Sequence, residues 1–302
     1  MTSTDVLDPS APQLPGEPAA GGRSLRGALR DFLGNRMGVV GLAAIVLMLL
    51  FSFVGPLLYR TDQVHPNLLL VTRHPSGQYP LGTDAVGFNV LGRLMVAGQS
   101  SLEVGLAAAA IATIVGTLWG AVAGFVGGWV DSVMMRIVDA LLAIPALLLV
   151  LLLTTIVTPS IIMVIFVLGL ISWLITARLV RGQVLVLKSL DYVQAAQQFG
   201  EPAWQIVARH LVRNVIGTVV VQATFEVANA ILLFAALSFL GLGPPPPATN
   251  WGGMLNDGLN YVFDGYWWLI YPAGVCIVIT VVAFNLIGDA IRNSLEVRLK
   301  NR

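Results

Sequence analysis

Long apolar stretches without charged residues dominate this sequence. Five of them lack Asp, Glu, Lys and Arg altogether: 37–59, 104–130, 140–177, 227–256 and 265–288. A helix needs about 20 residues, at about 1.5 Å each, to cross the hydrocarbon core of a bilayer, and every stretch is long enough. Only 11% of the residues are charged, against about 25% in soluble domains. The chain is therefore predicted to be an integral membrane protein, which excludes an ordinary soluble enzyme.

The stretch at 140–177 is too long for a single span. Residues 154–160 within it combine three threonines with a proline and a serine, a composition typical of a turn, and divide it into two helices. The sequence therefore predicts an all-α polytopic membrane protein with six transmembrane helices. These helices are expected at residues 37–59, 99–126, 133–157, 160–181, 214–241 and 266–289.

Six spans place both termini on one side of the membrane, and the basic residues indicate which side. With both termini in the cytoplasm, 14 of the 17 Lys and Arg residues lie on the inner side, as the positive-inside rule predicts. Only Arg60, Arg73 and Arg93 remain outside. The expected organisation is a cytoplasmic N-terminal tail (1–36), a first transmembrane helix (37–59), an extracytoplasmic segment (60–98), a five-helix core (99–291) and a cytoplasmic C-terminal tail (292–302).

The N-terminal tail has the composition of a disordered segment over its first 22 residues, which are rich in Pro, Gly, Ser and Ala. Leu25, Leu29, Phe32 and Leu33 then alternate with arginines and predict an amphipathic helix on the inner membrane surface. The first span follows Arg36 without a clear cleavage site. We expect it to be a retained anchor rather than a signal peptide.

The histidines and the cysteine do not predict a metal site. His65 and His74 lie nine residues apart without an acidic or cysteine companion, so we expect solvated loop histidines. Cys276 is the only cysteine, which excludes an intrachain disulfide and a cysteine-based metal site. No cofactor is expected on this chain.

The inner loop at 182–213 predicts two short amphipathic helices around a glycine. Asp191 and Gln194 have the spacing of a capping box at the start of the first helix. One face of this helix then carries Tyr192, Ala195, Ala196 and Phe199. Gly200 suits a left-handed helix stop, and Pro202 suits the first turn of the second helix. That second helix carries Trp204, Ile206, Val207, Arg209 and His210. Such a protrusion could dock a partner through its apolar face or pack against its own helix ends.

This loop resembles the coupling loop of the permease subunits of bacterial ABC importers. The resemblance rests on Tyr192-Val-Gln-Ala-Ala-Gln-Gln-Phe-Gly200, followed by Trp204-Gln-Ile and Arg209-His-Leu. The rest of the chain, from about residue 25 to 300, resembles the C-type permease of the dipeptide/oligopeptide branch. The motifs that carry this second resemblance are Pro80-Leu-Gly-Thr-Asp84, Gly127-Gly-Trp-Val-Asp131, Met135-Arg-Ile-Val-Asp139, Ala236-Leu-Ser-Phe-Leu-Gly-Leu-Gly243, Trp251-Gly252 and Ala283-Phe-Asn-Leu-Ile-Gly-Asp289.

The resemblance implies a type I ABC importer permease fold that encloses a translocation path together with a homologous permease. Two ATP-binding subunits, or one fused ATPase chain, would bind ATP and Mg below it, and an extracytoplasmic binding protein would deliver a peptide. Residues 191–200 would be the coupling helix, which enters a groove on an ATPase subunit. The chain has no GxxxxGK[ST] motif, so it is not expected to be an enzyme itself.

Several positions depart from the family pattern. Gln194 replaces the usual Glu, and Arg213 replaces the usual proline after His-Leu-x. Glutamine keeps the length and the hydrogen-bonding capacity of glutamate but loses its charge, which weakens the case for a salt bridge to the ATPase. On the outer side, Phe88 and Asn89 replace a common Arg-Asp pair, and Gln99 replaces a frequent Arg. These outer changes are consistent with a different partner or substrate, and equally with neutral drift.

Two intramembrane patterns stand out. Small residues recur every four positions at Ala108, Ala112, Gly116, Gly120 and Gly124. Such a stripe lets helix backbones approach closely, and we interpret it as a packing surface. The second pattern is a polar stripe of Gln222, Glu226 and Asn229 in the fifth span. Because burying Glu226 is costly, it is a candidate for the translocation path, or for a structural hydrogen bond to the partner permease.

Three further features are interpreted as mainly structural. Arg136 and Asp139 have the i,i+3 spacing of an ion pair. Trp251, Trp267 and Trp268 are expected to form an aromatic belt at the outer interface. The four prolines at 244–247 predict a rigid loop that braces the outer end or helps to dock the binding protein.

The sequence thus predicts a multi-pass permease subunit of an ABC importer in the bacterial plasma membrane, with peptides as substrate. Its expected partners are the second permease, the ATP-binding subunits, the binding protein, the peptide and the bilayer, with no nucleic acid. Importers of the same architecture carry nickel complexes, glutathione or other peptide-like solutes, which remain alternatives. A self-contained secondary transporter or channel is a more distant one, because it would need a polar ion path and usually inverted repeats.

Overall fold

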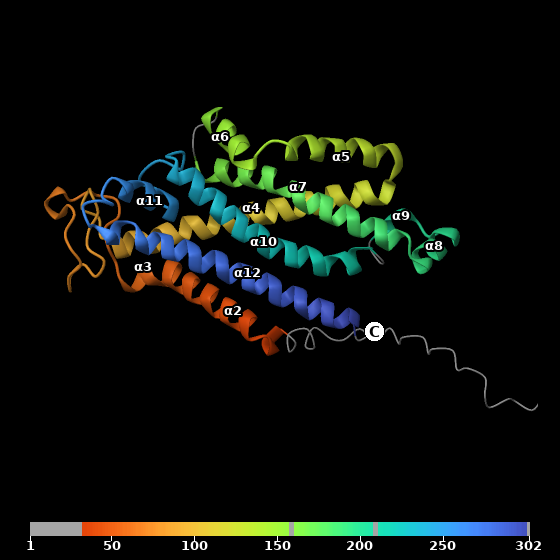
Figure 1. Cartoon of the computed structure of the whole chain (residues 1–302), viewed down its shortest axis with the longest axis horizontal. Coiled ribbons are helices and arrows are strands. Elements are labelled where there is room, and N and C mark those ends of the chain that lie inside the picture. Colours follow the sequence, from red (N-terminus) through yellow and green to blue (C-terminus); the bar gives the residue numbers. More distant parts are fainter. Residues whose placement is uncertain (1–31, 157–159, 208–210, 301–302) are drawn as a thin grey trace, which may run out of the picture.

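The chain is a helical bundle in a computed structural model that describes residues 32–156, 160–207 and 211–300 (Figure 1). In this part of the chain we find no β-strand, only an isolated bridge between Thr83 and Asn89. The elements are α2 (Arg36–Leu49), η1 (a π-helix, Leu50–Val54), α3 (Gly55–Leu58), η2 (Leu68–Leu70), α4 (Val90–Val126), α5 (Gly128–Leu142), α6 (Ala146–Ile156), α7 (Ile161–Lys188), α8 (Asp191–Gln198), α9 (Ala203–Ile206), α10 (Val212–Phe239), α11 (Trp251–Leu259), η4 (Trp267–Leu269) and α12 (Tyr271–Lys300).

The long helices run roughly side by side, and the short elements gather at the two ends of the bundle (Figure 1). Helices α8 and α9 lie at one end, whereas α11 and the segment between α3 and α4 lie at the opposite end. Five helical segments are long and apolar enough to cross a membrane, and α5 with α6 makes a sixth if the bent pair counts as one span. The predicted all-α membrane fold is therefore confirmed.

The third predicted span is wrong as a straight helix over 133–157. The structure has α5 and α6 instead, which meet at an angle of 84°. The break falls at Pro145, which has no N–H to continue the ladder of α5 and restricts the residue before it. The Pro145 carbonyl accepts the first hydrogen bond of α6, from the amide of Leu149 at 3.2 Å. A single proline therefore turns one expected helix into two.

Several helices extend beyond the predicted spans. Helix α4 begins at Val90 rather than 99, where the Asn89 side chain accepts a hydrogen bond from the amide of Gly92 at 3.0 Å. Helix α7 ends at Lys188 rather than 181, and α12 continues to Lys300 rather than 289. The charged residues at these ends mark the expected limit of the apolar span, but they do not terminate a helix.

The small-residue stripe of α4 is confirmed as a packing surface against α7. A methyl group on Gly116 would lie 2.6 Å from the carbonyl oxygen of Trp173. On Gly120 the same methyl would lie 2.3 Å from the carbonyl oxygen of Ala177. Both distances are shorter than a van der Waals contact, so only glycine allows the two backbones to approach this closely. The two helices make the most extensive helix–helix contact in the described part of the chain.

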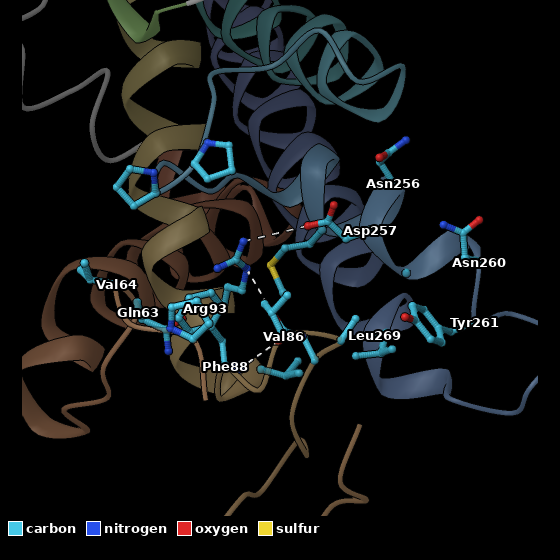
Figure 2. Close-up of a pocket in the computed structure, with 18 residues that line it drawn as sticks. Gln63, Val64, Val86, Phe88, Arg93, Asn256, Asp257, Asn260, Tyr261 and Leu269 are labelled. Atoms are coloured by element: carbon cyan, nitrogen blue, oxygen red, sulfur yellow. Dashed lines mark hydrogen bonds and ion pairs between the residues drawn. The ribbon is translucent and has the colours of Figure 1, made fainter. Parts of the chain in front are cut away.

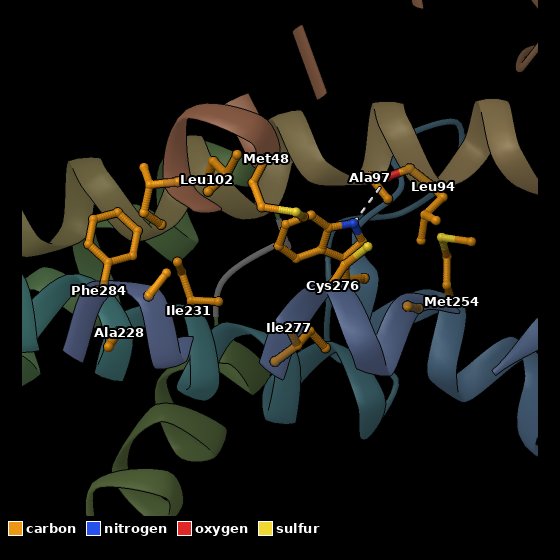
Figure 3. Packing of buried hydrophobic residues seen from close by; sticks show 14 of the residues in the cluster. Met48, Leu94, Ala97, Leu102, Ala228, Ile231, Met254, Cys276, Ile277 and Phe284 are labelled. Carbon is orange, nitrogen blue, oxygen red and sulfur yellow. Dashed lines mark hydrogen bonds between the residues drawn. The ribbon is translucent and has the colours of Figure 1, made fainter. Parts of the chain in front are cut away.

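The aromatic belt predicted at the outer interface is wrong for two of its three members. Trp251 and Trp268 are 0% and 2% exposed, while Trp267 is half exposed. The Trp251 indole N–H donates to the Leu94 carbonyl at 3.0 Å, drawn as the dashed line in Figure 3. The Trp268 indole N–H donates to the carbonyl of Thr83 at 3.3 Å. Both rings therefore belong to the core that joins α4, α10, α11 and α12, because each N–H finds a backbone acceptor inside.

Ion pairs hold α5 against α7 near the end of the bundle that carries α8. The Arg181 guanidinium donates to both carboxylate oxygens of Asp131, at 2.5 and 2.6 Å. Asp139 accepts from Arg178 at 2.6 Å, so the predicted local pair with Arg136 is wrong. The helix break at Gly127 and Gly128, both with positive φ, returns the chain so that α5 runs back along α7. Pairing across helices thus replaces pairing along one helix.

Both histidines of the segment between α3 and α4 are exposed, as the sequence predicts, although each has a neighbour that the sequence did not indicate. His65 does have an acidic companion, because its Nδ1 lies 2.9 Å from Asp62. Backbone N–H groups of Val64 and His65, together with the His65 ring, lower the pKa of Asp62 to about 2. His74 packs against the ring of Trp268, with centroids 4.7 Å apart. Within the described residues no group of three metal-ligating side chains comes together.

The expected amphipathic helix lies mostly outside the described residues. Leu25 and Leu29 fall in the part that the structure does not describe, whereas residues 32–34 are helical. Leu33 is 54% exposed there.

Candidate functional site

Helix α8 follows α7 after a link of only two residues, Ser189 and Leu190. The predicted capping box is wrong, because Leu190 occupies the N-cap position and Asp191 is the first helical residue. The Gln194 side chain donates to the carbonyl of Ser189 at 3.1 Å instead of capping a backbone amide. Gln194 therefore ties α8 to the end of α7, which a glutamate carboxylate could not do in the same way, since it only accepts hydrogen bonds when ionised.

The end of α8 has the left-handed stop that the sequence predicts at Gly200. Its φ is +78°, and a side chain built there meets nothing within 4 Å. The amide of Glu201 donates to the carbonyl of Ala196 at 3.0 Å, and that of Gly200 donates to Gln197 at 3.1 Å. This pair of bonds is a Schellman motif. The stop thus depends on backbone conformation alone and not on side-chain space.

One side chain of α8 is buried against the protein, and the aromatic residues at its two ends are exposed. Val193 is fully buried, whereas Phe199 is 91% exposed and Tyr192 is 46% exposed. Ala195 and Ala196 are half-buried. The aromatic residues of the predicted face are thus exposed to solvent. Val193, which anchors the helix, was not among the predicted residues. Its burial could have been predicted, because it is the one aliphatic side chain larger than alanine within α8.

The second short helix is α9, which starts directly after Pro202. The Pro202 carbonyl accepts from the amides of Gln205 and Ile206, at 2.9 and 3.2 Å. Ile206 is 1% exposed and fixes α9 against the protein. Trp204 lies on α9, while Arg209 and His210 fall outside the described residues.

The polar stripe of α10 divides into two parts. Glu226 is 2% exposed and accepts from Thr176 of α7 at 3.2 Å and from Gln222 at 2.9 Å, both at the same oxygen. Its other oxygen, Oε2, is buried without a hydrogen-bond partner in the described structure. Asn229, one turn on, is exposed. The structure therefore places Glu226 between α7 and α10, and leaves Asn229 on the outer face of the same helix.

The outer positions that depart from the family pattern have local roles. Phe88 lies under the guanidinium of Arg93, which is 4.8 Å from the ring centroid. Asn89 caps α4 and its amide also donates to the hydroxyl of Tyr59 at 2.8 Å. Because that hydroxyl donates to the Gln78 carbonyl at 3.2 Å, its oxygen is left to accept, and asparagine supplies a donor that ionised aspartate lacks.

Most of the chain matches two known protein-family models. Residues 116–301, from the last third of α4 to just beyond the end of α12, match the family model described as the binding-protein-dependent transport system inner membrane component. Residues 24–72 match the N-terminal TM domain of oligopeptide transport permease C. The chain belongs to this family of binding-protein-dependent permeases. Both α8 and the Gln222–Asn229 stripe lie within the matched region.

Curated relatives of this permease cover almost its whole length. The oligopeptide transport system permease protein OppC of Escherichia coli K12 is 43% identical over 279 residues, which is 91% of this chain and 92% of the relative. OppC of Bacillus subtilis is 37% identical over 273 residues, or 90% and 89%. The dipeptide transport system permease protein DppC of B. subtilis is also 37% identical over 273 residues, or 90% and 85%. The resemblance to dipeptide/oligopeptide permeases that the sequence motifs indicate is thereby confirmed.

Membership gives the permease a transport role in a membrane and no catalytic activity of its own. In this permease the loop that resembles the coupling loop is α8 to α9, and Phe199, the C-cap residue of α8, is 91% exposed.

Proposed function

We propose that this chain is a permease subunit of an ATP-driven importer that carries peptides across the bacterial plasma membrane. Helix α8 is the coupling helix and enters a groove on an ATP-binding subunit. The relatives named above are oligopeptide and dipeptide permeases, and their names support peptides as the substrate class. The observation that carries the coupling role is the exposed Phe199 on a helix that is itself anchored by buried Val193.

The geometry of α8 explains how movement would pass into the membrane. The helix is joined to α7 by two residues and by the Gln194–Ser189 hydrogen bond, so a movement of α8 is coupled to the end of α7. At its other end, the Schellman motif fixes the direction of the chain into α9. A pull on Phe199 by an ATPase subunit would therefore displace the end of α7. Through the close crossing of α7 with α4, this displacement would reach the centre of the bundle.

The remaining partners follow from the same proposal. A homologous permease pairs with this chain, an extracytoplasmic binding protein delivers the peptide, and ATP and Mg bind to partner subunits, either two chains or one fused chain. Both termini and α8 face the cytoplasm, and the segment between α3 and α4 faces outward. This orientation is supported by the excess of Lys and Arg at the α8 end of the bundle.

The polar stripe of α10 contributes to the path in this proposal. Exposed Asn229 faces the shared path, while Gln222 and Thr176 hold Glu226 just behind it. The unpartnered Oε2 of Glu226 is available to a cationic group of the substrate after a small helix movement.

The test of the coupling role is Gly200→Val in the assembled importer. A β-branched residue strongly disfavours positive φ, so the Schellman stop should be lost and ATP hydrolysis should proceed with at least tenfold less peptide uptake. Gly265→Val is the matched control, because Gly265 has φ +80° and equally open surroundings but lies in the outer loop before η4. Normal ATP-coupled uptake by Gly200→Val would contradict the coupling role of α8.

A further inference from the structure

The outer end of the bundle contains a cavity of about 680 Å³ that the proposed coupling and path do not use. Its walls come from three separate stretches of chain: the residues after α3, the turn before α4 with the first turn of α4 itself, and the region from the four prolines through α11 to η4 (Figure 2). The volume falls in the range of about 300–1,000 Å³ that is typical of small-molecule sites. A cavity assembled from three outer stretches, at the expected entry side, has the size for a short peptide.

Three charged residues converge on one side of this cavity. Arg93 lies 3.6 Å from Asp84 and 4.0 Å from Asp257, drawn as dashed lines in Figure 2. These distances exceed the 2.7–2.9 Å or so of a well-formed ionic hydrogen bond. Arg93 and Asp84 are 11% and 17% exposed at their side chains, but Asp257 is 65% exposed. The cavity therefore has a net negative charge, and its accessible charge is the Asp257 carboxylate.

The pKa of Asp257 is raised, as expected for a carboxylate whose charge is not fully neutralised by a neighbouring cation. Loss of hydration in the cavity raises the pKa of Asp257, Arg93 opposes this, and nearby Asp84 adds to it. Arg93 is shared between two carboxylates and neutralises only one negative charge. A positively charged group beside Asp257 would neutralise the other.

The other walls suit the rest of a peptide. Phe88, Met254 and Leu269 are 6–8% exposed and form an apolar surface. Asn256 and Asn260 extend from α11 and its end along the opposite rim (Figure 2). Side-chain amides supply both donors and acceptors, as a peptide backbone requires.

We propose that this cavity binds the amino-terminal end of a peptide, with its ammonium group on Asp257 and its first side chain on the surface formed by Phe88, Met254 and Leu269. This inference rests on the proposed peptide-import function. It adds an outer site on this chain that receives the substrate before it reaches α10. The free carboxylate of a peptide does not fit the same position, because Asp257 and Asp84 would repel it.

The test measures peptide binding to the purified complex of both permeases and the ATP-binding subunits, without the binding protein. The probes are trialanine and N-acetyl-trialanine, which differ only in the charged amine. Asp257→Asn should raise the Kd for trialanine about tenfold, the effect of losing one charge-assisted hydrogen bond, and leave that for the acetylated peptide unchanged. Asp257→Glu should retain the preference for the free amine.

The matched control is Asp264→Asn, which removes an exposed carboxylate from the same outer region outside the cavity lining. It should change neither Kd. Equal weakening of both probes by Asp257→Asn, or no change in either, would overturn the site. Absence of ATP-dependent peptide uptake by the wild-type importer would instead overturn the proposed function, and the binding comparison separates these two failures.

Discussion

The close crossing of α4 and α7 gives a prediction whose size follows from the structure. In Gly120→Ala, the added methyl would lie 2.3 Å from the carbonyl oxygen of Ala177 and 2.9 Å from the amide nitrogen of Arg181. Both neighbours are backbone atoms of α7 and cannot rotate away. Because carbon and oxygen need a separation of more than 3 Å, α4 and α7 must move apart by nearly 1 Å at this point.

The expected cost is about 1–3 kcal/mol, the range for adding a methyl group to a well-packed interior. Alanine also favours a helix over glycine by up to about 1 kcal/mol, which offsets part of this cost. Gly182→Ala measures that gain alone, because Gly182 lies within α7 with nothing near its missing side chain. The difference between the two variants isolates the steric cost. Gly124→Ala, where the closest atom is 3.0 Å away, should be intermediate.

Equilibrium unfolding in mixed detergent micelles gives the free energy of unfolding for the three variants. The expected order of stability is Gly182→Ala, then Gly124→Ala, then Gly120→Ala. The reasoning would be refuted if Gly120→Ala were within about 0.5 kcal/mol of Gly182→Ala, since the α4–α7 crossing would then tolerate a methyl group that the structure excludes.

Three further predictions concern single contacts. A double-mutant cycle on Asp131 and Arg181 should give a coupling energy of about 1–2 kcal/mol in the same unfolding assay, because the pair is bidentate and partly buried; a value below about 0.5 kcal/mol contradicts it. Trp251→Phe should cost about 1–3 kcal/mol, since it removes the bond to Leu94 and leaves a small void; an unchanged unfolding midpoint would argue against it. Glu226→Gln should lower uptake of cationic peptides several-fold with little effect on neutral ones, and unchanged uptake of both removes its role in the path.

The sequence predicts the fold well where the length of an apolar stretch determines a span. It predicts the fold less well where a single residue changes the direction of a helix. Charge-free length locates the spans, because the bilayer imposes about the same length on each of them. The break at Pro145 lies inside an apolar stretch, so the length criterion alone does not detect it. Trp251 and Trp268 look like interfacial residues from their position. Their burial depends on the Leu94 and Thr83 carbonyls, which come from distant parts of the chain.

The candidate site shows the same division between local and long-range information. The stop at Gly200 is predictable, because the Schellman motif involves only neighbouring residues. The partner of Asp139 is not, because Arg178 competes with the local Arg136 only after α5 has folded back on α7. The outer cavity also escapes prediction, since its residues lie far apart along the sequence and no motif connects them.

Cysteine cross-linking tests the contact of α8 with an ATP-binding subunit most directly. The only native cysteine, Cys276, is buried, so a new cysteine can be modified selectively. Phe199→Cys should be labelled only from the cytoplasmic side and should cross-link to an ATP-binding subunit. Phe263→Cys, at an equally exposed phenylalanine in the loop between α11 and η4, should be labelled only from outside and should not cross-link. Labelling of Phe199→Cys from outside, or its failure to cross-link in an assembled and active importer, would contradict the account.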